Sequence, residues 1–386
     1  MKKKVIIGIA SILLVISGCL FAMFNSGNRS YEVITNETEE RKMNTNALTM
    51  MLETGAGSGE YTVASDNTWP QDGYVFNERF SACENGSALT WDDTTKRVIV
   101  EANTVEKCYI YFDVEKPTLA STIEDLYTVD GENGLYYHDG IGDYTNANQE
   151  AGDNSYRFSG ANPNNYVCFG PGAEAEGTCA NDNLYRIIGL FDDDKDGNYQ
   201  IKLIKNTSIG NMAWNSSSNN TWSSASLNTG TLNGTYLSGL GTWASMIAEH
   251  DWEVGGMASS TTNTAKQYYA TELGNSDGNS ITYRAKIGLM YVTDYGYAAS
   301  GNHWTRALFN YDGVTSENWL YLGSTEWTIS RSLSSTGYAF YVDYRHVGSN
   351  FVAGGRAVRP SFYLASTVEI SSGTGTSTDP FVLSLG

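Results

Sequence analysis

Residues 183–205 read NLYRIIGLF-DDDKDGN-YQIKLIK, and this stretch decides the fold of the C-terminal part of the chain. The first run is apolar, aromatic and β-branched on both faces, which is typical of a strand buried on both sides. In the last run apolar and polar residues alternate, as in a strand with one buried face. An Asp/Gly/Asn cluster between two such runs favours a turn. We therefore predict a β-hairpin at the centre of a sheet that supports long loops.

The composition limits the classes of function. The chain has 386 residues, enough for two or three domains, and a formal net charge of −19, which disfavours binding to nucleic acid. Its 26 Tyr and 40 Gly are typical of secreted, loop-rich binding surfaces. Tyr is also a good strand residue, so the same composition fits a β-rich core.

The N-terminus predicts a membrane segment. Three lysines precede residues 5–24, which carry no charge, and a helix of that length reaches about 30 Å, the thickness of a hydrocarbon core. The lysines orient such a helix with the rest of the chain outside. Two alternatives remain open: a lipoprotein modified at Cys19 in the stretch ISGC, and a cleaved signal peptide. All three predict an extracytoplasmic protein, and the first two keep it anchored to the membrane by this segment.

Four further cysteines form two close pairs, Cys83 with Cys108 and Cys168 with Cys179. An even number in an exported chain predicts two disulfides. A zinc site would require C-x2-C spacing or a nearby histidine, and neither is present.

Residues 47–114 contain short strand-like runs punctuated by turn residues, as in a small β-sandwich. The pattern CENG…WDD…CYIYFD resembles a small disulfide-linked β module that recurs in surface proteins of Gram-positive-type bacteria. The resemblance attaches no chemistry to this module.

A second resemblance covers the C-terminal part, where LYRIIG, IKLIK, NTWSSASLN, AKIGLM, WTISR and AVRPSFYL follow one another in this order. The series resembles a family of uncharacterised bacterial and phage surface domains that is similar in fold to C-type lectins and to formylglycine-generating, sulfatase-modifying enzymes. The resemblance implies a small mixed sheet, two helices and long loops that carry ligand contacts. Gly230 falls where related sequences continue a helix, so we expect a short or broken helix there.

Together these patterns predict a mainly β chain with some α structure, of the α+β class. We expect a membrane helix at residues 1–24, a solvated stalk at 25–46 and a small β-sandwich-like module at 47–114. A linker with a short helix follows at 115–134, and a C-type-lectin-like domain fills 135–386.

No catalytic residues are predicted. Sulfatase-modifying activity needs reactive cysteines, and the lectin-like domain holds only Cys168 and Cys179, which are well placed to bond each other. The chain also lacks an H-E-x-x-H pair, a G-x-S-x-G elbow and a P-loop.

No cofactor is predicted, with calcium as an open alternative. Asp192, Asp194 and Asp196 alternate before Gly197, like the first half of a calcium loop, but its twelfth position is Leu203. A polar hairpin turn explains the same residues.

The predicted ligand surface lies on polar, Gly-rich loops at residues 304–311 and 332–355 that retain large aromatics. The candidate ligand-binding residues are Trp304, Trp319, Tyr338, Tyr341, Tyr344 and Phe351. The alternative is that these aromatics belong to the core. The acidic charge favours neutral glycans or basic protein patches as partners. We predict a cell-surface, non-catalytic, lectin-like or adhesin-like binding protein; a structural spacer without a specific ligand, or a glycan-processing enzyme, are the alternatives.

Overall fold

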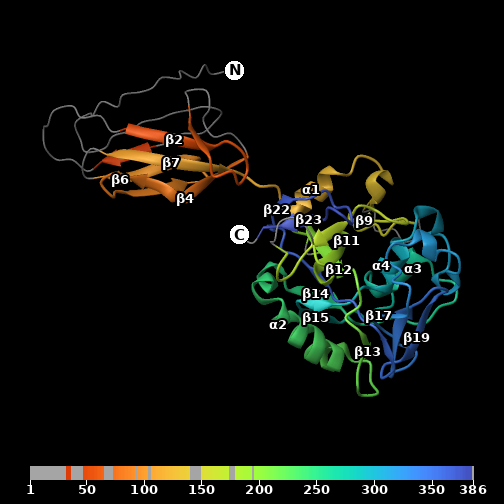
Figure 1. Cartoon of the computed structure of the whole chain (residues 1–386). Coiled ribbons are helices and arrows are strands. Elements are labelled where there is room, and N and C mark those ends of the chain that lie inside the picture. Colours follow the sequence, from red (N-terminus) through yellow and green to blue (C-terminus); the bar gives the residue numbers. More distant parts are fainter. Residues whose placement is uncertain are drawn as a thin grey trace, which may run out of the picture. The chain divides into compact units, whose positions relative to one another are not determined.

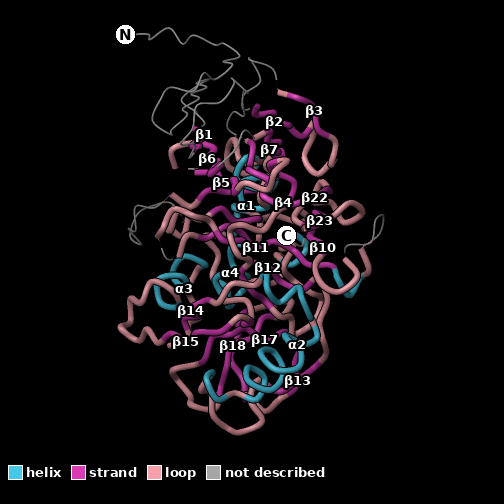
Figure 2. The backbone as a smooth tube through the Cα atoms, turned by 90° about the vertical axis from the view of Figure 1, so that its left-hand side faces the viewer, coloured by secondary structure: helices cyan, strands magenta, loops and turns pink. Residues whose placement is uncertain are grey.

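The computed structural model describes residues 32–35, 47–64, 73–92, 94–102, 106–139, 149–173, 179–193 and 195–384. The chain divides into two compact units, residues 1–116 and 117–386. The strands of the first unit are orange in Figure 1, and the second unit runs from yellow to blue. Strands and loops make up most of the backbone, and the helices are short (Figure 2).

The fold-class prediction requires a correction. Within the described ranges, no helix is both long enough and apolar enough to cross a membrane. Residues 1–24, with Cys19, lie outside these ranges, so the structure gives the predicted membrane helix no support. The described chain is mostly β. Strand β1 (Glu32–Thr35) falls within the predicted stalk and pairs in parallel with β6, so this part of residues 25–46 is a sheet strand.

The described part of the first unit contains two sheets. One has the order β3 (Tyr61–Val63), β2 (Ala47–Glu53), β7 (Lys107–Val114), β4 (Tyr74–Cys83), and the other has the order β1, β6 (Arg97–Ala102), β5 (Ala88–Asp92). Alternate residues of β7 are buried, and they share one apolar cluster with residues of β6. The predicted disulfide between Cys83 and Cys108 is confirmed, and it joins directly opposed positions of β4 and β7.

The predicted hairpin is confirmed as the centre of the second unit. Strands β11 (Leu184–Phe191) and β12 (Gln200–Lys205) pair in antiparallel fashion in a nine-stranded sheet, and every residue of β11 is buried. The main path of this sheet is β16 (Ile287–Gly288), β21 (Ser361–Tyr363), β12, β11, β10 (Tyr166–Cys168), β23 (Phe381–Leu383), β22 (Ile370–Ser372). The hairpin of β8 (Leu135–Tyr137) and β9 (Tyr156–Phe158) also joins β11.

Gly189 lets β9 approach β11 closely. A Cβ at this position would lie 2.2 Å from the carbonyl oxygen of Tyr156, so no larger residue fits without moving the backbone. The ladder of β11 with β12 shifts register between Ile187 and Gly189. This approach fixes the position of β9, which carries Arg157.

Two smaller sheets complete the second unit. One has the order β13 (Asn211–Ala213), β20 (Gly355–Ala357), β17 (Glu326–Arg331), β18 (Tyr338–Val342), β19 (Val347–Phe351); the other pairs β14 (His250–Glu253) with β15 (Thr282–Ala285). The α-helices are α1 (Leu119–Asp125), α2 (Leu237–Gly239), α3 (Ala265–Glu272) and α4 (Val292–Tyr297). The 3₁₀ turns are η1 (Glu132–Gly134), η2 (Asn181–Asn183), η3 (Trp222–Ser224), η5 (Gly241–Met246), η6 (Gly301–His303), η7 (Leu308–Asn310) and η8 (Thr315–Glu317).

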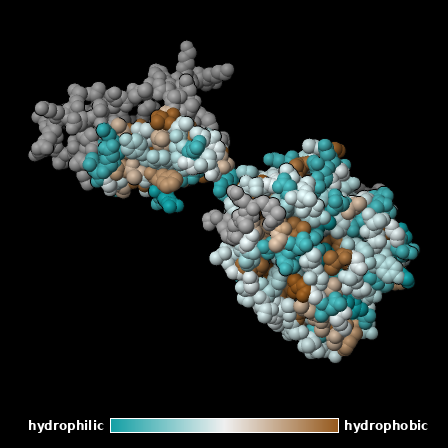
Figure 3. All heavy atoms as spheres, viewed as in Figure 1, coloured by the Kyte–Doolittle hydropathy of each residue, from teal (hydrophilic) through white to brown (hydrophobic). Residues whose placement is uncertain are grey.

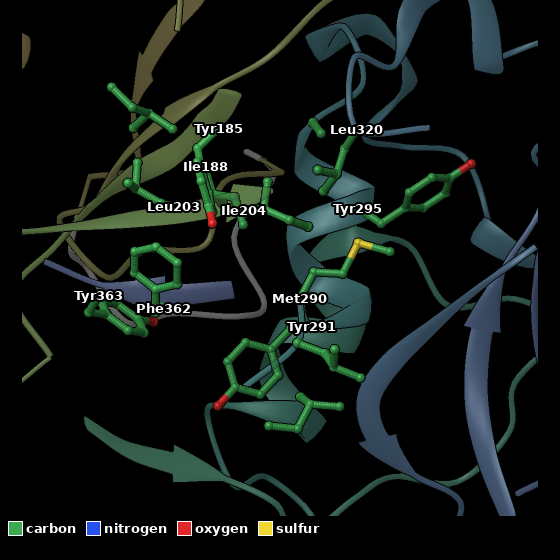
Figure 4. Close-up of a cluster of buried hydrophobic side chains, with 14 of the residues drawn as sticks. Tyr185, Ile188, Leu203, Ile204, Met290, Tyr291, Tyr295, Leu320, Phe362 and Tyr363 are labelled. Atoms are coloured by element: carbon green, nitrogen blue, oxygen red, sulfur yellow. The ribbon is translucent and has the colours of Figure 1, made fainter. Parts of the chain in front are cut away.

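The core of the second unit joins its central sheet to α4. In Figure 4 the labelled side chains of β11, β12 and β21 gather with those of Met290, Tyr291 and Tyr295. Helix α1 also contributes Leu119 and Ile123 to this core. The segment predicted as a linker therefore packs as part of the second unit, because its short helix has an apolar face.

The helix expected to be short or broken at Gly230 continues through it as the ten-residue π-helix η4 (Leu227–Tyr236). A π-helix brings residues five apart onto one side. Accordingly, Asn233 donates to the side-chain oxygen of Asn228 at 2.8 Å and exchanges two hydrogen bonds with the backbone of Ile287. These amide contacts stabilise the wider helix.

The predicted disulfide between Cys168 and Cys179 is also confirmed. It closes a short loop beside β10, so replacing both cysteines by Ala should lower the free energy of unfolding of the second unit by about 3 kcal/mol. Urea unfolding followed by tryptophan fluorescence measures this loss. The control replaces Cys83 and Cys108, which should leave the transition of the second unit unchanged; an equal loss there would contradict the assignment of each bridge to its own unit.

Candidate functional site

The second unit contains a pocket of about 770 Å³ beside the β11–β12 turn. We call it the charged pocket, and its defining residues are Arg157, Asp193, Lys202, His250, Asp294 and Tyr363. These residues come from β9, β12, β14, α4, β21 and the hairpin turn. The central sheet and the elements packed on it therefore assemble a site from residues that are distant in sequence.

A network of buried charges forms the floor of the charged pocket. Lys202 Nζ lies 2.7 Å from Asp294 Oδ2, and Arg157 Nη2 lies 2.6 Å from Asp153 Oδ2. Arg157 Nη1 and Asp294 Oδ1 are 3.6 Å apart. Burial lowers the pKa of Lys202, while Asp294 opposes that shift. Burial also acts to lower the pKa of Arg157, but Asp153 and Asp294 together raise it. Both cations are thus held by carboxylates rather than by water.

Aromatic rings surround the ammonium group of Lys202. Its Nζ lies 4.2 Å from the ring centre of Tyr291 and 5.3 Å from those of Trp252 and Tyr363. Such cation–π contacts, together with Asp294, replace the water that burial removes from the ammonium.

His250 and Asp193 form the wall and the mouth of the charged pocket. The His250 ring stacks on Tyr363 with 3.8 Å between centres, and its Nε2 lies 3.6 Å from Asp193 Oδ2. Burial, with the charges of Lys202 and Arg284, lowers the pKa of His250 to about 3, so the ring is neutral. The Asp193 side chain is half exposed at the mouth; the burial of its other half, and then the charge of Asp153, raise its pKa toward about 6.

The charged pocket is acidic overall. Among the described residues, its lining contains seven carboxylates and four cations, a net charge of −3 with His250 neutral. At the rim, Arg284 pairs with Glu249 and Asp251, at 3.0 and 3.1 Å. A ligand that enters therefore meets an excess of negative charge, which favours cationic or hydroxyl-rich groups.

The structure brings some of the predicted ligand-binding aromatics together on the β18–β19 hairpin. Tyr338 and Phe351 are directly opposed in the ladder, so their side chains share one face, and both are exposed. Tyr344, at the turn of the same hairpin, is also exposed, and Tyr341 is half-buried. The visible face of the second unit is mostly pale or teal with isolated brown residues (Figure 3), so exposed apolar side chains are scattered there.

The prediction that Trp304 and Trp319 contact a ligand is wrong, because both are 5 % exposed and belong to the core. Trp304 Nε1 donates to the carbonyl oxygen of Ala299 at 3.0 Å, and Trp319 Nε1 donates to that of Phe158 at 2.7 Å. The guanidinium of Arg186 lies 4.5 Å from the Trp319 ring centre. Interior partners thus satisfy both indole groups.

A smaller pocket of about 300 Å³ opens beside the β18–β19 hairpin. Its lining combines aromatic rings with hydroxyl groups, and it includes Phe309, Tyr341, His346, Ser259, Ser260 and Ser349. We call this pocket, together with Tyr338, Tyr344 and Phe351, the aromatic surface. The described lining contains no Asp, Glu, Lys or Arg, so it differs sharply from the charged pocket.

The carboxylates proposed for calcium serve the hairpin turn where they are described. Asp192 accepts hydrogen bonds from the backbone N–H of Gly197, and Asp196 accepts one from Asn198 at 2.8 Å. Asp194 lies outside the described residues. Across the described ranges, the only group of three potential metal ligands is Cys83, Glu106 and Cys108, and its cysteines form a disulfide.

No protein-family model, curated protein or solved structure matches this chain. The resemblance to C-type lectins and to formylglycine-generating enzymes therefore stays a prediction.

Sequence reasoning missed the charged pocket. Its residues extend from Arg157 to Tyr363 and form no motif. One signal was present: Lys202 lies inside the apolar run IKLI of a strand predicted to be central. A lysine at such a position is almost never fully buried without a partner, so it indicates a carboxylate elsewhere in the fold.

Proposed function

We propose that residues 117–386 form an extracytoplasmic, non-catalytic domain of lectin-like fold that binds a neutral glycan at the aromatic surface. The observation that carries this proposal is the exposed pair of Tyr338 and Phe351 beside a pocket lined with hydroxyl groups. The two disulfides support a location outside the cytoplasm, since such bonds persist in oxidising compartments.

The chemistry of the aromatic surface fits a sugar. Phe309, Tyr338, Tyr344 and Phe351 are between 39 and 48 % exposed, and flat aromatic faces pack against the C–H faces of sugar rings. The Ser and Thr hydroxyls of the pocket can both donate to and accept from sugar hydroxyls. The described pocket lining carries no carboxylate, ammonium or guanidinium, which suits a neutral ligand; the guanidinium groups of Arg345 and Arg356 lie outside this lining, against the rings of Tyr344 and Tyr341.

The geometry of the hairpin also supports recognition at this place. Gly348 lies opposite Tyr341 in the ladder, and a Cβ there would come within 2.8 Å of the Tyr341 hydroxyl. The glycine thus leaves room for the Tyr341 ring to lie across the strand. Its hydroxyl is 3.3 Å from His346 Nε2, which fixes the ring at the pocket.

The test is a neutral-glycan array probed with the exported chain, followed by Ala variants. Replacing Tyr338 or Phe351 by Ala should weaken binding of the array hit about 30-fold, equivalent to roughly 2 kcal/mol, because each removes an exposed contact face. The melting temperature should stay within a few degrees, since neither ring is in the core.

Phe80 provides a matched control, because it is 48 % exposed but belongs to the first unit. Phe80→Ala should not change binding. If no neutral glycan binds, or if the Tyr338 and Phe351 variants bind as the parent does, the aromatic surface is not a glycan site and a spacer role without ligand is favoured.

A further inference from the structure

We propose that the charged pocket is a second ligand site, separate from the aromatic surface, and that it binds an amino sugar, a hydroxyl-rich ligand that carries a primary ammonium group. The pocket floor supplies the contacts for a hydroxyl, the mouth supplies a carboxylate for the ammonium, and an aromatic wall lies between them.

The floor presents a hydrogen-bond donor and an acceptor that make no hydrogen bond within the protein. These atoms are Arg157 Nη1 and Asp294 Oδ1, and they lie 3.6 Å apart. Arg157 is 1 % exposed and Asp294 is 2 % exposed, and both residues line the pocket. Because both atoms have almost no solvent-exposed area, one sugar hydroxyl, which can donate one hydrogen bond and accept others, satisfies both only if the lining moves slightly to admit it.

The rest of the network holds these two atoms in place. Asp153 fixes Arg157 through the other guanidinium nitrogen, and Lys202 with the backbone N–H of Tyr291 fixes Asp294 through its other oxygen. Each side chain therefore keeps one polar atom without a hydrogen bond while its other polar atoms are held. A site that is already ordered loses little conformational entropy when a ligand binds.

The mouth favours an ammonium group. Asp193 is half exposed there, and the nearest histidine, His250, is neutral and therefore does not neutralise it. At the rim, by contrast, Glu249 and Asp251 already share Arg284. A ligand ammonium beside Asp193 offsets part of the excess negative charge of the lining.

The wall and the volume fit a sugar ring. His250 and Tyr363 are stacked on each other and line the pocket; Tyr363 is almost fully buried, so the His250 ring, 12 % exposed, is the surface against which a sugar ring can pack. The volume of about 770 Å³ lies within the range of about 300–1,000 Å³ that is typical of small-molecule sites. A simple amine would leave the floor atoms unsatisfied, and a neutral sugar would leave Asp193 without a counter-charge, so the combination selects an amino sugar.

The experiment measures binding of three oligosaccharides to the full chain by calorimetry at pH 7. They are oligomers of glucosamine, of N-acetylglucosamine and of glucose, which differ in the group at the second carbon. We expect the glucosamine oligomer to bind at least tenfold more tightly than the other two. Equal binding of the three, binding of none, or tighter binding of a lysine-rich peptide would overturn the proposal.

Variants then locate the site. Asp193→Asn should weaken glucosamine binding at least tenfold while leaving the melting temperature nearly unchanged, because this side chain is half exposed. Asp312→Asn removes an exposed carboxylate outside the pocket and should have no effect. Tyr338→Ala, on the aromatic surface, should also leave glucosamine binding intact. The proposals for the two sites are therefore tested independently of each other. An unchanged affinity in Asp193→Asn would place the ammonium elsewhere.

The pH dependence gives an independent readout. Asp193 is faced by Asp153 and Arg157 from the β9 side, and by Lys202, His250, Asp294 and Tyr363. Burial, and then Asp153, raise its pKa toward about 6, so the carboxylate takes up a proton as the pH falls through this range while the amino groups of the ligand gain theirs; the readout is therefore the affinity of the parent relative to Asp193→Asn, and this ratio should fall with the pH. The pKa of His250 is about 3, so this residue stays neutral throughout that pH range. Asp193→Asn should keep only the pH dependence that comes from the ligand, and a ratio of parent to variant affinity that does not change with pH would contradict the role of Asp193.

Discussion

Asp294→Asn should lower the free energy of unfolding of the second unit by about 3–5 kcal/mol, although the two side chains have nearly the same shape. Asparagine still accepts the hydrogen bond that Tyr291 N–H donates to Asp294 at 2.8 Å, so the start of α4 keeps its cap. The loss is one of charge. The buried quartet contains Arg157 and Lys202 against Asp153 and Asp294, and removing one carboxylate leaves an uncompensated positive charge in the interior.

Lys202→Met tests the other member of the Lys202–Asp294 ion pair. The flexible thioether fits among the rings of Tyr291, Trp252 and Tyr363, but the variant leaves the quartet with an uncompensated negative charge. We expect this single change to be destabilising as well, by an amount of the same order as Asp294→Asn.

The double variant, Lys202→Met with Asp294→Asn, should be more stable than either single variant by about 2 kcal/mol, because the remaining Arg157–Asp153 pair is neutral. Urea unfolding of the four proteins at pH 7 measures the coupling free energy. If the two single effects simply add, the quartet does not act as one electrostatic unit, and the cost comes from packing instead.

The hairpin of β11 and β12 could be predicted because its signals are local. The apolar run, the turn residues and the alternating run all lie within residues 183–205, and their pairing needs no information from elsewhere in the chain. The disulfides were similarly accessible from the number and spacing of the cysteines. Helix α1 lies in residues 115–134, which were predicted to be a linker with a short helix. Leu119 and Ile123 are four residues apart and give this helix an apolar face, and such a face favours packing onto a core.

Exposure of the aromatic residues could not be predicted, because distant partners decide it. Trp319 and Tyr338 occur in similar Gly-, Ser- and Asn-rich surroundings. Trp319 is buried because its indole N–H reaches the carbonyl oxygen of Phe158, 161 residues earlier, whereas Tyr338 lies on a hairpin near the edge of its sheet. Lys202 illustrates the same limit: alternation placed it on a polar face, but α4 brings in Asp294 from 92 residues away and buries the pair.

The contacts of Arg359 show a structural role. Its Nε and Nη2 donate to the two oxygens of Glu326, both at 2.8 Å, and Nη2 also donates to the carbonyl oxygen of Leu320 at 2.6 Å. Both side chains are almost fully buried. The pair connects β17 to the segment that precedes β21, and so links the two larger sheets of the second unit.

Glu326→Gln should lower the free energy of unfolding by about 3–5 kcal/mol, because it leaves Arg359 charged in the interior. The effect is aggravated by a second guanidinium. Burial lowers the pKa of Arg186 to about 10, and the like charge of Arg359 makes a smaller contribution in the same direction. Glu326 is the carboxylate that offsets Arg359, and an arginine cannot escape the cost by losing its proton at ordinary pH.

Arg359→Met should behave differently, because Glu326 can take up a proton. Burial already raises the pKa of Glu326 above its usual value, against the lowering effect of Arg359, and removing Arg359 removes that opposition. A carboxyl with a pKa raised in the folded state contributes stability that is full below its unfolded pKa of about 4.3 and is lost as the pH rises through the folded pKa. Arg359→Met should therefore be markedly less destabilised at pH 5 than at pH 8, relative to the parent protein, whereas Glu326→Gln should show no such recovery. Urea unfolding of both variants and the parent at the two pH values provides the measurement. Parallel pH profiles for the two variants would show that Glu326 stays ionised without its partner, and that the cost of losing Arg359 comes from its packing and its hydrogen bond to Leu320.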